Sequence, residues 1–520
     1  MFDKYLNNRF LILYLIPLIL GSLSVFSFQP FNYTFINFLI LPILFYIIIL
    51  IKKKSKSRYR KKPYKKNLFI FGTTFGFSFY ICGLYWIVNS LTFEENFKYL
   101  IPFALIFIPL FLSLFFSITI TIFGPYLNLN IPSILVFSGA IGLSDFIRAK
   151  VLTGFPWNLW AYSFSWAIEI IQALNLIGLF AFNLLIITLF TLPAVLFFKI
   201  NIKKKLALLA FIILTFFTLY IYGNYSINKN DIFLKSQSDK FNVKVISPNF
   251  DLKYELSVEE IENRLKKLIR YSEPNKKIKT LFIWPEGALS GYSYNDVTEF
   301  KNVISKNFSD NHYILFGINR LNDEKGKYYN SLVIVNNEFE ILQQYNKQKL
   351  VPFGEFLPFE KFLKKLGLKK ITEGHGSFLK GDKQKNLIIE NLNILPMICY
   401  EIIFTKLIQQ ANDRTNLIIN ISEDGWFGKT IGPEQHFAKA MFRAIEQNSF
   451  LIRSANKGIS AIISNKGEII KKLNINEAGN IDLDVPLIKS NYKNKNDLIF
   501  FIILFTYLLI YKSYKKNNEK

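Results

Sequence analysis

Eight long apolar runs limit what this chain can fold into. A helix needs about 20 mostly apolar residues to cross the hydrocarbon core of a bilayer. It also satisfies all of its backbone polar groups internally, which a bilayer requires. We therefore predict an α-helical polytopic membrane bundle of about eight transmembrane helices. The runs are Leu11–Phe28, Phe35–Ile51, Leu68–Leu91, Leu100–Leu127, Ser133–Ile147, Ile170–Phe198, Leu206–Tyr222 and Leu498–Tyr511.

Positive charge lies between these runs and orients them. The chain carries a net charge of +25, and its densest basic segment is residues 52–66. Basic loops beside transmembrane helices stay in the cytoplasm. With eight spans, the N-terminus, residues 199–205 and the tail after Lys512 fall on that side too, and all are basic. Because topology explains the charge, we expect no nucleic-acid partner.

A long polar segment, residues 227–490, separates the last two runs and would face the extracytoplasmic side. Strand patterns alternate there with helix patterns, which indicates an α/β layered domain. Ser257 and Glu260 form a capping box before an amphipathic helix. We assign residues 1–226 to the first seven spans, 227–490 to a globular domain and 491–520 to the last span and a cytoplasmic tail. The predicted strands are Phe241–Ser247, Thr280–Trp284, Tyr313–Ile318, Leu332–Val335, Leu387–Glu390, Asn393–Cys399, Leu417–Ile421, Phe450–Ser454 and Ser460–Ile463.

Three strand ends in this domain carry residues suited to acyl-transfer chemistry. Cys399 ends the apolar run Leu392–Ile398, Glu286 ends Phe282–Trp284 within Trp-Pro-Glu-Gly, and Lys347 follows another strand. Taken singly, each has an ordinary explanation as a buried thiol, a turn carboxylate or a solvated lysine. Together they supply a nucleophile, a base and a fixed positive charge.

The chemistry requires these residue types. A thiol is mostly protonated at neutral pH and needs a base, so Glu286 would accept the proton of Cys399. Attack on an ester carbonyl places negative charge on oxygen, which Lys347 and the Tyr400 amide would stabilise. The chain's two cysteines and three histidines show no zinc-ligand spacing, so we expect neither a metal nor another cofactor.

The motifs resemble the Glu-Lys-Cys triad of the nitrilase (carbon–nitrogen hydrolase) superfamily. They are Trp-Pro-Glu at residues 284–286, Tyr-Asn-Lys-x-x-Leu-Val-Pro-Phe-Gly-Glu at 345–355 and Ile-Cys-Tyr-Glu at 398–401. Gly-Phe-Pro-Trp at 154–157 and the predicted spans make the whole chain similar to the apolipoprotein N-acyltransferase family, its membrane-bound branch. The resemblance implies an αββα nitrilase-like domain on a bundle in the bacterial cytoplasmic (inner) membrane, with the domain in the periplasm.

The resemblance also implies the reaction and its partners. Cys399 would take an acyl chain from a membrane phospholipid as a thioester. The N-terminal amine of a diacylglyceryl-modified apolipoprotein would then accept it, and we expect a monomeric enzyme. Glu355 matches a second glutamate that would hold Lys347, while Tyr400 and Glu401 match residues that follow the nucleophile.

Lipid and substrate contacts are expected at three aromatic residues: Trp157, Tyr254 and Trp426. Two segments depart from the family pattern. Residues 248–254 replace Asn-x-Pro-Gln and a nearby tryptophan, and Glu423-Asp424-Gly425-Trp426 replaces Asn-Asp-Ala-Trp. Residues 359–371 read either as an amphipathic lid in the lipid headgroups or as an ordinary surface helix.

Two other functions remain open at this stage. A membrane-tethered nitrilase-type amidase would share the triad, although hydrolysis of a small C–N bond needs only one anchor. A transporter or receptor would carry ionisable residues within its spans. Asp145, Arg148 and Glu169 lie only at or near span ends, which disfavours a transport path.

Overall fold

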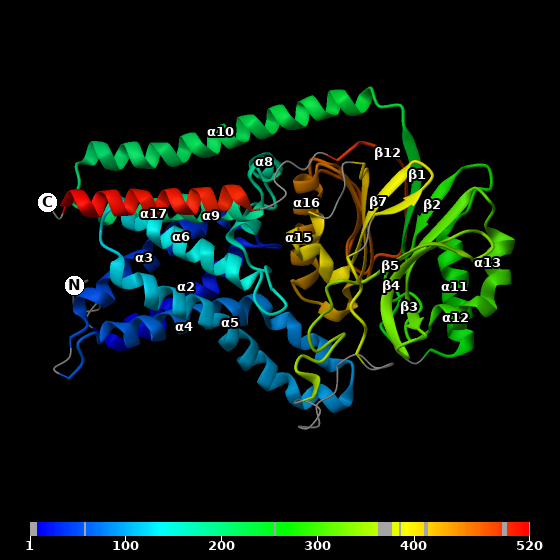
Figure 1. The fold of residues 1–520 in the computed structure, drawn as a ribbon, viewed down its shortest axis with the longest axis horizontal. Coiled ribbons are helices and arrows are strands. Elements are labelled where there is room, and N and C mark those ends of the chain that lie inside the picture. The colour runs from blue at the N-terminus through cyan, green and yellow to red at the C-terminus, as the bar shows by residue number, and fades with distance from the viewer. Residues whose placement is uncertain are drawn as a thin grey trace. The chain divides into compact units, whose positions relative to one another are not determined.

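The computed structural model describes residues 8–56, 59–253, 256–361, 377–383, 386–409, 414–490 and 497–518 (Figure 1). The chain divides into two compact units. A helical unit contains Met1–Ser226 with Lys493–Lys520, and a second unit contains Ile227–Tyr492.

The helical unit confirms the predicted membrane bundle. Within the described ranges, seven helical segments are long and apolar enough to cross a membrane, and the first predicted run forms the shorter segment Leu11–Ser27. The run Ile170–Phe198 is not one helix, because the chain breaks at Gly178, whose φ is +77°. The helices are α2 Ile16–Ser24, α3 Asn37–Lys54, α4 Tyr64–Leu84, α5 Ile101–Phe123, α6 Ile131–Arg148, α7 Ile168–Ile171, α8 Leu174–Ile177, α9 Leu179–Thr191, α10 Ile202–Lys235 and α17 Leu498–Asn518.

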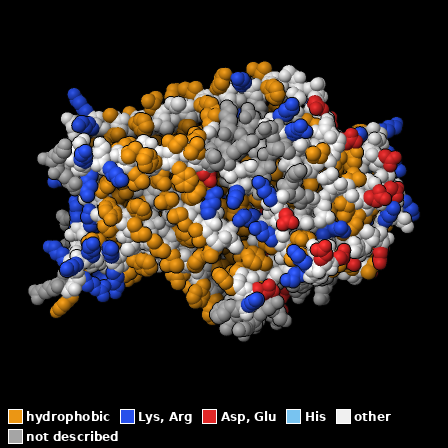
Figure 2. Space-filling view, viewed as in Figure 1, with side chains coloured by type: hydrophobic (Ala, Val, Ile, Leu, Met, Phe, Trp, Pro, Cys, Tyr) orange, Lys and Arg blue, Asp and Glu red, His pale blue; other side chains and the backbone are white. Residues whose placement is uncertain are grey.

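Large apolar side chains cover the outside of this unit. Phe211 and Phe217 of α10 and Phe505 of α17 are each more than half exposed. A soluble protein rarely exposes so much contiguous apolar surface, whereas a bilayer covers it. Figure 2 shows hydrophobic side chains over the flank of the unit and Lys and Arg side chains at one end, in keeping with the basic last turns of α3 and α17.

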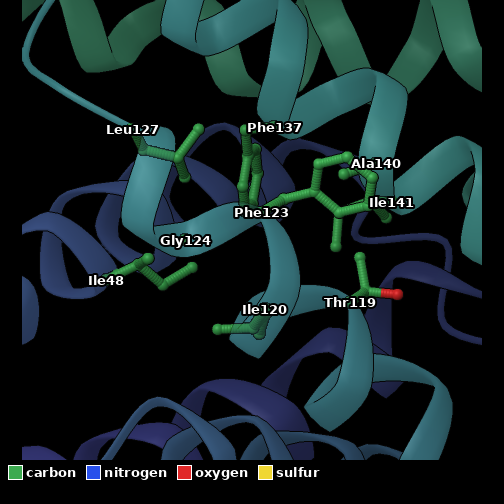
Figure 3. Close-up of a pocket in the computed structure, with 9 residues that line it drawn as sticks. All are labelled: Ile48, Thr119, Ile120, Phe123, Gly124, Leu127, Phe137, Ala140 and Ile141. Carbon is green, nitrogen blue, oxygen red and sulfur yellow. The ribbon is translucent and has the colours of Figure 1, made fainter. Parts of the chain in front are cut away.

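A small apolar pocket lies among α3, α5 and α6 (Figure 3). Ile48, Phe123 and Phe137 are among the side chains that line it, and Thr119 supplies a hydroxyl at its edge. Nearby, Lys52 Nζ donates to the carbonyl oxygen of Leu127 over 3.0 Å. The lysine thus ties the end of α3 to the turn after α5.

A buried polar cluster stabilises α6 and the loop after it. Arg148 Nη2 donates to Asp145 Oδ1 over 2.9 Å, and Asn183 Nδ2 donates to Asp145 Oδ2 over 3.0 Å. Arg148 Nη1 also donates to the carbonyl oxygen of Phe155. The ion pair therefore holds the Gly-Phe-Pro-Trp loop. A buried charge needs such a partner.

The second unit consists of two six-stranded sheets with strand orders β12-β1-β2-β3-β4-β5 and β11-β10-β9-β8-β7-β6. The central strands β1, β2 and β3 are parallel, as are β7, β8 and β9, and the remaining pairs are antiparallel. The strands are β1 Lys240–Ser247, β2 Thr280–Ile283, β3 His312–Asn322, β4 Lys327–Val335, β5 Ile341–Asn346, β6 Leu387–Ile389, β7 Leu392–Ile398, β8 Leu417–Glu423, β9 Phe450–Asn456, β10 Ser460–Ile463, β11 Ile469–Leu473 and β12 Gly479–Pro486.

Side-chain alternation explains the layering. Leu281 and Ile283 of β2 pack in one core with Ile398 and Ile419 of the other sheet, while Phe282 packs in a second core on the opposite face. Successive residues of a strand point to opposite faces. The second core includes α11, and α16 lies against β9. The predicted αββα arrangement is therefore confirmed. The unit's helices are α11 Val258–Ser272, α12 Tyr294–Val297, α13 Lys301–Asn307, α15 Thr405–Ile408 and α16 Gly432–Gln447.

Candidate active site

The three predicted chemical residues all lie just beyond strand ends. Cys399 directly follows β7, Lys347 directly follows β5, and Glu286 lies three residues after β2. Cys399 has a φ of +48° and is half-buried. A non-glycine residue with positive φ is uncommon and often marks a functional turn. The sharp turn ends the buried strand, and the half-buried Cys399 side chain packs at the edge of the core between the sheets.

Lys347 is held between two carboxylates. Its Nζ donates to Glu355 Oε1 over 2.8 Å and to Glu286 Oε1 over 3.3 Å, and its side chain is only 1% exposed. Burial alone would lower the pKa of Lys347, but Glu286 and Glu355 more than offset this and raise it above its usual value. Lys347 therefore remains a fixed ammonium group.

Asn330, on β4, joins the same two carboxylates and was missed by the sequence analysis. Its Nδ2 donates to Glu286 Oε1 over 2.8 Å and to Glu355 Oε1 over 2.7 Å. Glu355 Oε2 in turn accepts from the backbone N–H of Val351 over 2.8 Å. The only available signal was an asparagine within a strand, where asparagine is disfavoured.

The other oxygen of Glu286 accepts from the backbone of β8. The N–H of Glu423 donates to Glu286 Oε2 over 3.1 Å. Glu286 thus receives hydrogen bonds from Lys347, Asn330 and Glu423. Donors from the middle of β4, the end of β8 and the turn after β5 fix the direction of its carboxylate, as a general base requires.

Both Glu286 and Lys347 shift the pKa of the Cys399 thiol. Burial raises its pKa, Glu286 raises it further, and Lys347 lowers it; the net pKa lies above the usual range. Cys399 is therefore a thiol at neutral pH and needs a base to become a nucleophile. The following residue, Tyr400, is half-buried, and its ring packs edge-on to Phe404 with 5.1 Å between centroids.

Glu401 connects the nucleophile turn to the lysine turn. It is fully buried and accepts from the backbone N–H groups of Ile398, Gln348 and Lys349 over 2.9, 2.7 and 3.0 Å. The hydroxyl of Tyr345 also donates to it. Burial raises the pKa of Glu401 to about 7 against the pull of these hydrogen bonds. One side chain thus fixes the backbone on both sides of the site.

The aromatic predictions have three different outcomes. Trp157 was expected to contact lipid, but its side chain is 1% exposed and packs on Trp86 with ring centroids 4.6 Å apart. Neighbouring rings cover its side chain, and lipid contact by Trp157 stays a prediction. Trp426 is half-buried in the turn after β8. Tyr254 lies outside the described residues, as does most of the predicted lid at 359–371.

No cluster of three or more His, Cys, Asp or Glu side chains able to hold a metal ion occurs in the described part of the chain. The site instead offers one thiol, two carboxylates and one ammonium group.

Comparison with known proteins gives the class of this fold and site. Residues 254–489 match the carbon-nitrogen hydrolase family, and residues 20–192 match the apolipoprotein N-acyltransferase N-terminal domain. Among solved structures, Saccharomyces cerevisiae Nit3, a member of branch 10 of the nitrilase superfamily, aligns with a TM-score of 0.35 at 15% identity, covering 48% of this chain and 91% of that one. The two family matches show that the chain combines a carbon–nitrogen hydrolase domain with an N-terminal membrane-helix domain.

Full-length relatives narrow the class further. The apolipoprotein N-acyltransferase of Rickettsia typhi is 33% identical, covering 95% of this chain and 98% of that one. The enzyme of Rickettsia prowazekii is 32% identical with the same coverage, and that of Rhodopseudomonas palustris is 29% identical, covering 91% of this chain and 89% of that one. This chain belongs to the apolipoprotein N-acyltransferase family.

Proposed function

We propose that this enzyme N-acylates apolipoproteins by a two-step transfer through a thioester on Cys399. The donor is a membrane phospholipid, and the acceptor is the N-terminal amine of a diacylglyceryl-modified cysteine. The observation that carries the proposal is the convergence of Lys347 and Asn330 on Glu286, in electrostatic contact with a thiol at a strained strand end.

In the first step, Glu286 accepts the proton of Cys399 as the sulfur attacks the ester carbonyl of the phospholipid. Lys347 and the backbone N–H of Tyr400 stabilise the oxyanion. The C–O ester bond then breaks, and Glu286 returns the proton to the leaving alkoxide. The products are a lysophospholipid and the acyl thioester.

In the second step, the amine of the apolipoprotein attacks the thioester carbonyl. Glu286 accepts the ammonium proton that develops on the nitrogen and delivers it to the departing Cys399 sulfur. An amide forms, the C–S bond breaks and the free thiol is restored. Both steps use one base in alternating protonation states, as general acid–base catalysis allows.

The lipid character of both substrates accounts for the helical unit. Moving an acyl chain through water costs about 0.8 kcal/mol for each methylene group exposed. We propose that the second unit lies on the periplasmic face of the inner membrane, where it meets both substrates. An amidase acting on a small soluble molecule would have no use for such a bundle, and residues 20–192 match the N-acyltransferase membrane domain.

A phospholipid assay tests this function. The purified enzyme, incubated with phospholipid and no acceptor, should release one equivalent of lysophospholipid and gain a hydroxylamine-sensitive acyl group on Cys399. Cys399→Ser should lack the thioester, and Lys347→Ala should slow its formation at least tenfold while remaining folded, since one oxyanion donor contributes on the order of 10²–10³ in rate. A Cys82→Ser control should behave as wild type. Release of free fatty acid without a thioester, or hydrolysis of small amides alone, would contradict the proposal.

A further inference from the structure

Glu423 places a second carboxyl group beside Glu286. It ends β8 and is 3% exposed. Its backbone N–H holds Glu286 Oε2, and its side chain lies against the Glu286 turn. A Cβ atom on Gly287, whose φ is +71°, would come within 2.9 Å of Glu423 Oε2. The Glu423 carboxyl group therefore packs directly against the turn that carries Glu286.

The Glu423 side chain is also tied to a neighbouring loop. Its Oε1 accepts from the N–H of Gly425 over 2.8 Å, and its Oε2 accepts from Asn456 Nδ2 over 2.7 Å. Asn456 in turn pairs with the backbone of Phe250, accepting from its N–H over 2.8 Å and donating to its carbonyl oxygen over 2.9 Å. The two segments that depart from the family pattern, 248–254 and 423–426, are thus joined through Asn456.

Charged groups of both signs surround Glu423, but the cations among them form their ion pairs and hydrogen bonds with other groups. Glu286 faces it from the turn after β2, and Asp424 is its chain neighbour. Asp424 is itself paired with Arg453 of β9 and with His436 of α16. Arg264 of α11 donates to the carbonyl oxygens of Asp251 and Ala288 and attracts Glu423 electrostatically without a direct ion pair. Lys457, after β9, pairs with Asp251. Within the described ranges, no cation forms an ion pair with Glu423.

We propose that Glu423 is a proton-carrying positioning residue: its backbone N–H holds Glu286 in place, and its protonated side chain adds no second negative charge beside Glu286. Two adjacent carboxyl groups in one buried site do not both ionise readily. Burial, together with Glu286 and Asp424, raises the pKa of Glu423 to about 8 against the hydrogen bonds from Asn456 and Gly425.

The proposal predicts how the site responds to pH. Below about pH 8 Glu423 is neutral and adds no negative charge beside Glu286. Above that pH, Glu423 becomes a second anion, which opposes negative charge on the sulfur and on the oxyanion. The predicted effect of Glu423 ionisation on acyl transfer rests on the proposed function. Its effect on the Cys399 thiol can be measured without any acyl transfer.

The decisive measurement is the rate of Cys399 alkylation by iodoacetamide against pH, in the full chain with Cys82→Ser. With Glu423→Gln, which stays neutral, the alkylation profile should shift to lower pH by about one unit, the size of a typical like-charge effect. The single-turnover release of lysophospholipid should lose its alkaline fall, although the rate at pH 7 drops a few-fold because glutamine accepts only one of the two hydrogen bonds.

The variant Asn456→Ala tests the protonation of Glu423 without replacing Glu423 itself. The amide of Asn456 lowers the pKa of Glu423, so its removal should move the alkaline fall to higher pH. Glu299→Gln, on the exposed surface, is the matched control and should leave both profiles unchanged. Identical pH profiles in wild type, Glu423→Gln and Asn456→Ala would overturn the inference and leave a purely structural role. Absence of a thioester in the wild-type enzyme would instead overturn the proposed function. The alkylation shift would still decide whether the inference about Glu423 holds.

Discussion

Asn330 shows how one neutral side chain can organise a charged site. Its two N–H bonds match the nearest oxygens of Glu286 and Glu355, so both carboxylates point at Lys347 without crowding one another. Hydrogen bonds to charged groups are worth about 1.5–3 kcal/mol each. Much of the orientation of the base therefore depends on a residue that takes no part in proton transfer.

Asn330→Ala should slow thioester formation by about 10–100-fold, because a loss of about 1.4 kcal/mol in transition-state stabilisation is tenfold in rate. The measurement is single-turnover release of lysophospholipid, with thermal unfolding as a check on the fold. Asn302→Ala, on the surface of α13, is the matched control. An unchanged rate in Asn330→Ala would show that Lys347 alone orients Glu286.

The sequence predicted the triad but not this bridge, for a physical reason. Glu286, Lys347 and Cys399 each end a strand within a distinctive local motif. Asn330 reaches them from the middle of the β4 ladder, opposite Asn319 in the register, and no local pattern shows which carboxylates lie above it. The roles of Glu423 and Asn456 likewise depend on contacts between distant segments.

At the scale of elements, Glu401 fixes the end of β7 to the turn after β5. A glutamine in its place would set an amide N–H₂ against backbone N–H donors, which leaves buried groups unpaired. Glu401→Gln should lower the free energy of unfolding by about 3 kcal/mol, since each unpaired buried group costs about 1–3 kcal/mol. Thermal unfolding of the full chain measures this, with Glu324→Gln in the exposed β3–β4 turn as control. Wild-type stability in Glu401→Gln would mean that the two turns are held by other contacts.

The ion pair on α6 gives a second prediction. Arg148→Met should reduce the yield of folded protein and destabilise it by about 3–5 kcal/mol, because it strands the buried Asp145 carboxylate. The double variant Asp145→Asn, Arg148→Met should recover part of the loss. Thermal unfolding in detergent compares the two. If the double variant is no better than the single one, the contact of Arg148 with the Phe155 carbonyl matters more than the charge pairing.

Most elements of the second unit follow from local pattern, and the exceptions are instructive. The capping box at Ser257 and Glu260 forms as expected. The predicted strand Phe241–Ser247 is β1, and Leu417–Ile421 lies within β8. β11 and β12 were missed because they lie at sheet edges and lack a continuous apolar run; every residue of β11 is at least partly exposed. Their pairing is set by distant strands, since β12 pairs with β1 from across the unit.

For the whole molecule, the charge distribution predicts topology. Lys325→Cys, in the β3–β4 turn, should react with a membrane-impermeant maleimide on intact spheroplasts. Lys203→Cys, in the basic first turn of α10, should react only after permeabilisation. Both are made with Cys82→Ser and Cys399→Ser, so that no native thiol interferes. The reverse labelling pattern would place the second unit in the cytoplasm and exclude periplasmic acyl transfer.

The left-handed backbone at Cys399 also restricts which nucleophiles evolution or an engineer can install there. A β-branched residue at positive φ is a genuine outlier, so threonine would distort the turn that aims the reactive atom. Serine has no such branch and can adopt the turn, which leaves it as the one aliphatic hydroxyl amino acid that fits the bend. The backbone conformation at this position thus limits which nucleophilic side chains the site can carry.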